Sequence, residues 1–217
     1  MIPTAAPPTK LKKVTERRVL WVASHPVTFA EFLDRFGEDD DVELVDGVVL
    51  ERMAAQLEHE KLFAWLFRLM GDYVEERDLG IVLGSRTAVE INEYRGRLPD
   101  LLFVRRERQE IVREKAIFGA PDLVIEFVSP NDRSSDLIAR ETDYRAIGVA
   151  EIVFINPRRR QVRALRKRDA AWDEAPLGSG EVLVLETVDG FAVDVDWLLA
   201  EPRPAVRPTL ERLLAGS

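Results

Sequence analysis

Three acidic residues stand in segments that otherwise resemble buried strands, and carboxylates in such places can hold a metal ion. Glu126 lies inside the apolar run PDLVIEFV, Asp100 inside RLPDLLFV, and Glu43 inside VELVDG. A buried carboxylate without a partner is very costly, so each must be hydrogen-bonded, paired with a cation or bound to a metal. Three acids on three strands could converge at one end of a sheet, where Mg²⁺ would neutralise them. Such an ion activates water and stabilises charge on a phosphoryl group.

Each acid also has a purely structural interpretation. Glu126 could pair with an arginine, and Glu43 could face water on an edge strand. Asp100 and Asp122 both follow proline, so they could begin strands or cap turns. The position of Glu126 within an otherwise apolar run favours a functional site.

Several elements precede or surround these acids. Thr28 and Glu31 have the spacing of a capping box, which predicts a short helix over 28–36. Asp46-Gly47 lies between two β-rich arms and predicts a tight hairpin. The apolar residues of 56–78 recur at helical spacing and predict a long helix with one buried face.

A strand–helix–strand unit is the most definite part of the predicted topology. The continuous apolar run 121–129 indicates a strand buried on both faces. The following helix should end at Ile147, with Gly148 as the left-handed residue after it. A second buried strand begins at Val149, and the two strands should be parallel. Further short strands on either side indicate an α/β or α+β domain with a mixed central sheet flanked by helices.

Composition narrows the function classes. The 217 residues carry a net charge of −8, which argues against a broadly basic nucleic-acid-binding coat but not against a local basic groove. Cysteine is absent, which excludes disulfides, thiol catalysis and cysteine-bound zinc. With only His25 and His59, any metal must be held mainly by oxygen.

The two ends of the chain differ from its centre in composition, and they bear on location and domain boundaries. The N-terminus lacks the apolar segment of a signal peptide, and no stretch approaches the ~20 apolar residues of a membrane span, so a cytoplasmic location is expected. The predicted division is an N-terminal arm over 1–27, one domain over 28–200, and a proline-rich linker with a short C-terminal helix over 201–217.

The order of several motifs resembles the Uma-type restriction endonuclease family of the PD-(D/E)xK nuclease superfamily. The motifs are ELVDG, Met53, His59 at the start of a long helix, PDLLFV, PDLVIEFVSP and YRAIGVAEIVFINP. The similarity spans roughly 28–199. It implies a restriction-endonuclease-like fold, a divalent metal such as Mg²⁺ or Mn²⁺, and DNA as the substrate.

The resemblance places the metal-binding acids on Asp100 and Glu126, and an upstream acid on Glu43. In the superfamily, a lysine often stands two residues after the second acid, where this chain has Val128. Some relatives carry that lysine on the next helix, where this chain has Arg140. Arginine keeps its charge and binds phosphate but does not act as a base, so Arg140 could stabilise the transition state or mark an inactive enzyme.

Other residues near these motifs have weaker claims to a function. Lys61, near His59 on the predicted long helix, is the lysine that could substitute for the missing catalytic lysine. An ordinary solvated charge on the helix is the simpler interpretation of Lys61. His59 matches a family histidine and could touch the metal-bound water or the phosphate. Ser129 and Asn131 could position the site but more simply cap the next helix.

Two further sets of charged residues lie on the predicted helix that carries Arg140 and on the basic stretch that follows the next strand. Asp136 and Glu141 lie near Arg140 on the same predicted helix and could be its salt-bridge partners. The basic stretch 158–168 could contact DNA phosphates. It could equally be an edge strand whose charges prevent aggregation.

The leading prediction is therefore a Mg²⁺-dependent DNA endonuclease with Asp100 and Glu126 on the metal. The alternative is a catalytically degenerate module that binds DNA or a protein without cleavage. A homodimer is plausible because cutting both DNA strands needs two sites.

Overall fold

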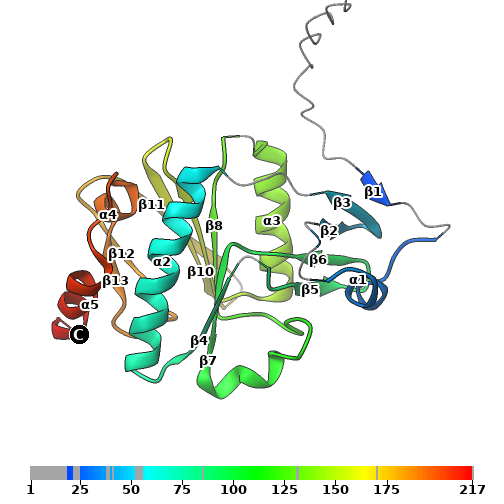
Figure 1. Ribbon diagram of the computed structural model, residues 1–217, viewed down its shortest axis with the longest axis horizontal. Helices are drawn as coiled ribbons and strands as arrows, with labels where there is room; N and C mark the ends of the chain where they lie inside the picture. The colour runs from blue at the N-terminus through cyan, green and yellow to red at the C-terminus, as the bar shows by residue number, and fades with distance from the viewer. Residues whose placement is uncertain are drawn as a thin grey trace, which may run out of the picture.

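A mixed six-stranded sheet forms the centre of the computed structural model (Figure 1). The structure describes residues 19–21, 25–37, 40, 42–51, 56–84, 86–130, 132–169 and 171–216. The strand order is β11-β10-β9-β8-β7-β4. In chain order the strands are β4 (Gly80–Gly84), β7 (Leu101–Arg105), β8 (Leu123–Phe127), β9 (Glu151–Asn156), β10 (Gln161–Arg168) and β11 (Ala171–Leu177).

Two long helices cover opposite faces of this sheet. Helix α2 (Leu57–Glu76) packs on the face that receives Leu123 and Ile125 of β8, while α3 (Ser134–Ile147) packs on the face that receives Val124 (Figure 1). Every residue of β8 is buried. This confirms the prediction of a strand covered on both faces, because successive side chains of a strand point to opposite sides.

The predicted strand–helix–strand unit is confirmed. Strands β8 and β9 are parallel, with Glu126 opposite Phe154, and they are the parallel pair of a sheet whose other neighbours run antiparallel. Helix α3 ends at Ile147, and Gly148 follows with φ of 88°, a left-handed conformation that glycine adopts without steric penalty.

A smaller sheet of order β1-β3-β2 lies at the side of the molecule. It contains β1 (Val19–Trp21), β2 (Val42–Val45) and β3 (Val48–Glu51). The turn between β2 and β3 has positive φ at both Asp46 (51°) and Gly47 (72°), as a two-residue hairpin turn requires. A Cβ at Gly47 would also lie 2.6 Å from the Pro26 side chain, so the predicted hairpin depends on this glycine.

Some elements were not predicted from the sequence. They are β1, β6, β11, a 3₁₀ helix over Arg106–Ile111 and the short helix Val195–Leu199. Strand β6 (Arg95–Arg97) forms a hairpin with β5 (Val89–Asn92), beside the smaller sheet (Figure 1). Strand β1 pairs with β3, so three residues of the predicted N-terminal arm belong to a sheet. Residues 1–18 and 22–24 of that arm lie outside the described residues.

The C-terminal segment packs on α2. After β12 (Val182–Val184), β13 (Ala192–Asp194) and α4 (Val195–Leu199), helix α5 (Val206–Ala215) places Leu213 in the core shared with α2. Trp65 of α2 donates its Nε1–H to the Pro204 carbonyl at 2.7 Å. Of the helices that the structure describes, none has the length and apolar character to cross a bilayer.

The capping box predicted at the start of α1 (Phe29–Arg35) is present. The Glu31 backbone N–H donates to the Thr28 hydroxyl at 3.2 Å, and the Thr28 N–H donates to the Glu31 carboxylate at 2.9 Å. Hydrogen bonds to the Glu31 carboxylate lower its pKa to about 2. The Thr28 N–H acts most strongly, followed by the His25 side chain and by the Thr28 hydroxyl, which donates to Oε2 at 3.0 Å.

The ionised Glu31 should therefore stabilise the fold in a definite pH range. Because its folded-state pKa lies below the ordinary value of 4.5, the contribution is complete above about pH 4.5 and is lost as the pH falls through about 2. Thermal unfolding of wild type and Glu31→Gln should show a lower melting temperature for the variant at pH 7, and the two values should converge as the pH falls through and below about 2. A difference that stays constant over this range would contradict the assignment.

Candidate active site

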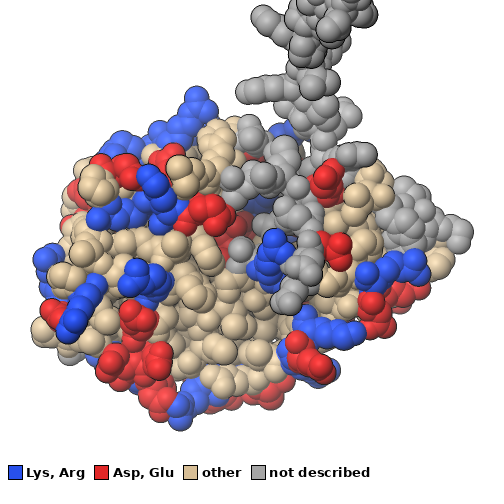
Figure 2. All heavy atoms as spheres, in the orientation of Figure 1, with Lys and Arg blue, Asp and Glu red and all other residues tan. Residues whose placement is uncertain are grey.

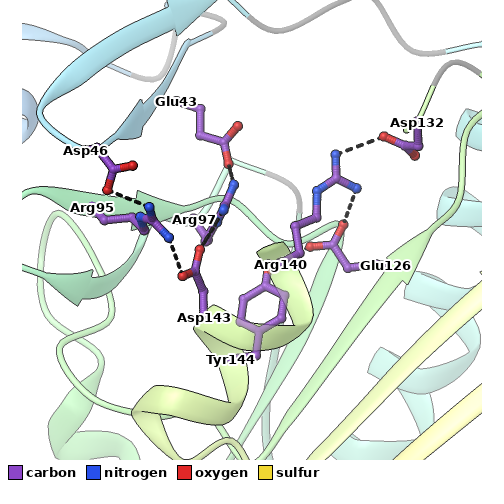
Figure 3. Close-up of polar contacts among 9 residues, drawn as sticks. All are labelled: Glu43, Asp46, Arg95, Arg97, Glu126, Asp132, Arg140, Asp143 and Tyr144. Atoms are coloured by element: carbon purple, nitrogen blue, oxygen red, sulfur yellow. Dashed lines mark hydrogen bonds and ion pairs between the residues drawn. The ribbon is translucent and has the colours of Figure 1, made fainter. Parts of the chain in front are cut away.

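Glu126 of β8 is 4% exposed, and both of its carboxylate oxygens have partners on α3. The Tyr144 hydroxyl donates to Oε1 at 2.5 Å, and Nη1 of Arg140 donates to Oε2 at 3.3 Å. Figure 3 shows Arg140 and Tyr144 directed from the helix toward the strand. Burial, and then the charge of Glu126, raise the pKa of Tyr144 well above its ordinary value, so Tyr144 stays a neutral donor.

Asp100 precedes β7 and lies at the same end of the sheet as Glu126. The antiparallel register pairs Leu101 with Ile125, so Asp100 and Glu126 each stand one residue beyond this pair, at the same end of the two strands. The Phe127 backbone N–H donates to Oδ2 of Asp100 at 2.8 Å, and Nε2 of His59 lies 3.2 Å from Oδ1. Two of the three predicted acids therefore lie at the same end of neighbouring strands, and each is held by specific donors.

His59 lies in the first turn of α2 and links that helix to Asp100. Its ring packs edge-to-face on Phe127, with 5.4 Å between centroids. Burial would lower the pKa of His59, but the hydrogen bond and charge of Asp100, with a smaller effect of Glu60, raise it above 6.5. His59 is thus placed to orient Asp100.

Arg140 pairs with Glu126, in line with the expectation that this acid could pair with an arginine, but its second partner is not one of those predicted. Its Nη2 donates to Oδ1 of Asp132 at 3.0 Å, in addition to the contact with Glu126. The predicted partner Glu141 instead pairs with Arg145 and Arg163. Burial opposes the charge of Arg140, but Glu126, Asp132 and more distant Glu43 raise its pKa, so the guanidinium is permanently charged.

The other predicted partner of Arg140, Asp136, lies in the first turn of α3, and no pair between the two is found. The proposal that Ser129 caps this helix is also wrong. The N-cap of α3 is Arg133, without a side-chain cap, and the Ser129 N–H donates to Asp132. Asn131, like Met53, lies outside the described residues. Asp132 was missed because its reach to Arg140 depends on the path of the loop before α3.

Glu43 does not share a sheet with the other two acids, contrary to the expectation of a single edge. It belongs to β2 of the smaller sheet, is 7% exposed, and accepts a hydrogen bond from Nη1 of Arg97 at 2.6 Å. The interpretation of Glu43 as a water-facing edge residue is therefore wrong. Its negative charge still contributes to the raised pKa of Arg140, so it lies near the Glu126 site without being part of the pair described above.

Arg97 connects Glu43 to a buried ion network that the sequence did not reveal. Nε of Arg97 donates to Asp143 of α3 at 2.7 Å. Arg95 donates to the same carboxylate at 2.6 Å and to Asp46 of the β2–β3 turn at 2.5 Å (Figure 3). The network thereby ties the smaller sheet to the helix that carries Arg140 and Tyr144.

Removal of Arg97 should destabilise the whole protein. Arg97→Leu would remove the buried guanidinium that pairs with both Glu43 and Asp143, and breaking a buried ion pair costs about 3–5 kcal/mol. Urea unfolding gives the measurement. The control is Arg207→Leu, which removes an exposed i,i+4 pair with Glu211 and should change stability by less than about 0.5 kcal/mol. Equal effects of the two variants would refute the structural role.

Two further sequence interpretations concern basic residues. Lys61 pairs with Glu201 at 3.0 Å and is half exposed, which agrees with an ordinary helix charge. Strand β10, which holds much of the basic stretch 158–168, is not an edge strand, because β11 covers it. Its charges are balanced locally, Arg163 by Glu141 and Glu174, and Arg166 by Glu151. Figure 2 likewise shows positive and negative side chains interspersed on one face.

The donor set at the sheet end suits a hard divalent cation. Mg²⁺ is usually held by one or two carboxylates and keeps several waters, and Asp100 with Glu126 supplies two. Within the described ranges no group of three or more histidine, aspartate or glutamate side chains is arranged to hold a metal. A metal here would thus be bound by two protein carboxylates, with its other ligands from water or substrate.

A mixed central sheet flanked by helices is the architecture of a restriction-endonuclease-like domain. The chain matches the Uma2 family, described as "Putative restriction endonuclease", over residues 29–196, and it belongs to that family. No curated protein is significantly similar to it. A crystal structure from Anabaena variabilis, titled a putative nuclease belonging to DUF820, superposes with a TM-score of 0.67 at 18% identity, covering 80% of this chain and 98% of that one. This likeness confirms the predicted fold class.

Proposed function

We propose that the protein hydrolyses phosphodiester bonds of DNA with Mg²⁺ or Mn²⁺ held by Asp100 and Glu126. The observation that carries this proposal is the placement of two buried carboxylates at the same end of adjacent strands, in a chain of the Uma2 family. When bound, such a cation acidifies water and offsets charge on the phosphate.

The protein's own side chains would position and balance this centre. His59 and the Phe127 N–H hold the two oxygens of Asp100, and Tyr144 holds one oxygen of Glu126. Preorganised donors of this kind need no rearrangement during the reaction. Glu43 acts indirectly, since its charge is paired with Arg97.

Arg140 would take the role that lysine has in related nucleases, but only in part. Its permanent charge can stabilise negative charge that develops on a scissile phosphate. It cannot accept a proton from water, because its pKa is raised further by Glu126 and Asp132. One such site cuts one strand, so cleavage of both strands would require a homodimer or two successive encounters.

A second candidate function, a module that binds DNA or a protein without cleavage, is favoured by one observation. All four oxygens of Asp100 and Glu126 already contact donors within the protein. Replacing Glu126 by an apolar residue and measuring stability does not separate the two functions, because Arg140 and Tyr144 would lose their contacts with Glu126 in either case. Cleavage assays do separate them.

Neutral isosteres of the two acids provide the main test. Wild type should nick supercoiled plasmid in Mg²⁺ or Mn²⁺ but not in EDTA. The nicking activity of Asp100→Asn and of Glu126→Gln should fall by more than about 100-fold. Changes to residues that only support metal ligands typically reduce activity by about 10–100-fold. The control Glu211→Gln alters an exposed acid of α5 and should retain full activity. Pure wild-type protein that never nicks DNA, or nicks it equally in EDTA, would exclude the proposal.

Substitutions of Arg140 test its role as a fixed positive charge. Arg140→Lys keeps the charge and should retain activity within about tenfold, whereas Arg140→Gln removes a donor to developing charge and should lose about 10²–10³-fold in kcat. Circular dichroism melts of both variants report whether the contact with Asp132 is needed for folding. Full activity in Arg140→Gln would mean that Arg140 is structural only.

A further inference from the structure

A pocket lies beside the candidate site, between the first turn of α2 and the end of β8. Its wall includes His59, Phe127, Ser129 and Arg158, with Glu58 as its one carboxylate. His59 and Phe127 are the residues that hold the Asp100 carboxylate. The pocket therefore shares a wall with the proposed metal centre, and a ligand that spans both would contact Arg158.

Arg158 differs from most of the basic residues that follow it. Arg160, Arg163, Arg166 and Arg168 each pair with an acid. Among the described residues, no acid contacts the side chain of Arg158, which is exposed at the turn after β9. An arginine without an internal partner, placed at a pocket next to an anion-processing site, is available to an external anion.

The chemistry of that anion follows from the proposed substrate. A DNA strand carries a phosphate on each side of the one being cleaved, and guanidinium groups bind phosphate oxygens through two parallel N–H donors. We propose that Arg158 binds a backbone phosphate of DNA adjacent to the scissile phosphate, with the pocket as its seat. This inference rests on the proposed function, because it takes DNA as the substrate.

Such a contact has a specific thermodynamic signature. Each phosphate neutralised on duplex DNA contributes about 0.9 to the slope of log K against log salt, so loss of one contact lowers that slope by about 0.9. Loss of this contact should also weaken the binding of DNA duplexes of different sequence by the same factor, because the phosphate carries no base information.

The test compares Arg158→Gln with Arg159→Gln. Arg159 is the neighbouring exposed arginine of the same turn and does not line the pocket. Binding of fluorescein-labelled duplex DNA is followed by anisotropy in EDTA, where hydrolysis does not occur, across a series of NaCl concentrations. We expect the magnitude of the slope of log K against log NaCl to decrease by about 0.9 for Arg158→Gln and to stay unchanged for Arg159→Gln.

The inference is overturned if Arg158→Gln keeps the wild-type slope, if both variants change it equally, or if the protein does not bind DNA. These outcomes are distinct from failure of the proposed function. Wild type that binds DNA with an Arg158-dependent slope but never cleaves it would retain the phosphate site and exclude the nuclease. If wild type cleaves DNA but the salt dependence of its binding does not change in Arg158→Gln, the nuclease function stands and the phosphate site is excluded.

Discussion

The burial of one carboxylate determines how the centre of this protein is built. Glu126 lies on a central strand of the sheet and is buried, where an unpaired charge would cost several kcal/mol, and α3 supplies Arg140 and Tyr144 as its partners. Arg140 and Tyr144 are four residues apart and therefore project from the same side of that helix. The docking of α3 on β8 and the compensation of Glu126 therefore use the same helix face, so the fold and the candidate site share these contacts.

The large elements were predictable because their signals are local. The capping box at Thr28, the turn at Asp46-Gly47 and the glycine after α3 each require only a few neighbouring residues, and all three are present. The short strands β1 and β6 have no such signal. Their pairing depends on partners that are distant in the chain, which periodicity within a short window does not report.

The site was predictable in its acids but not in its partners. Asp100 and Glu126 stand out against apolar strands, and the register brings them to one end of the sheet. The network through Arg97 and Asp143 gave no comparable signal, because a charged residue on a short strand or a helix surface is ordinary in sequence. The partner of Arg140 was misassigned for the same reason, since helical spacing favours near neighbours and the structure uses Asp132 from a loop.

The arrangement of α3 has a consequence for how the sequence can vary in length. An inserted residue within a helix rotates everything after it by about 100° and shifts it by about 1.5 Å. A deletion or insertion between Arg140 and Tyr144 would therefore separate the two groups that hold Glu126. Length changes in the segment between β8 and α3 would alter the Asp132 contact and the pocket wall at Ser129, but not the spacing of Arg140 and Tyr144. Indels in homologues should then accumulate before the helix and be absent from its second half.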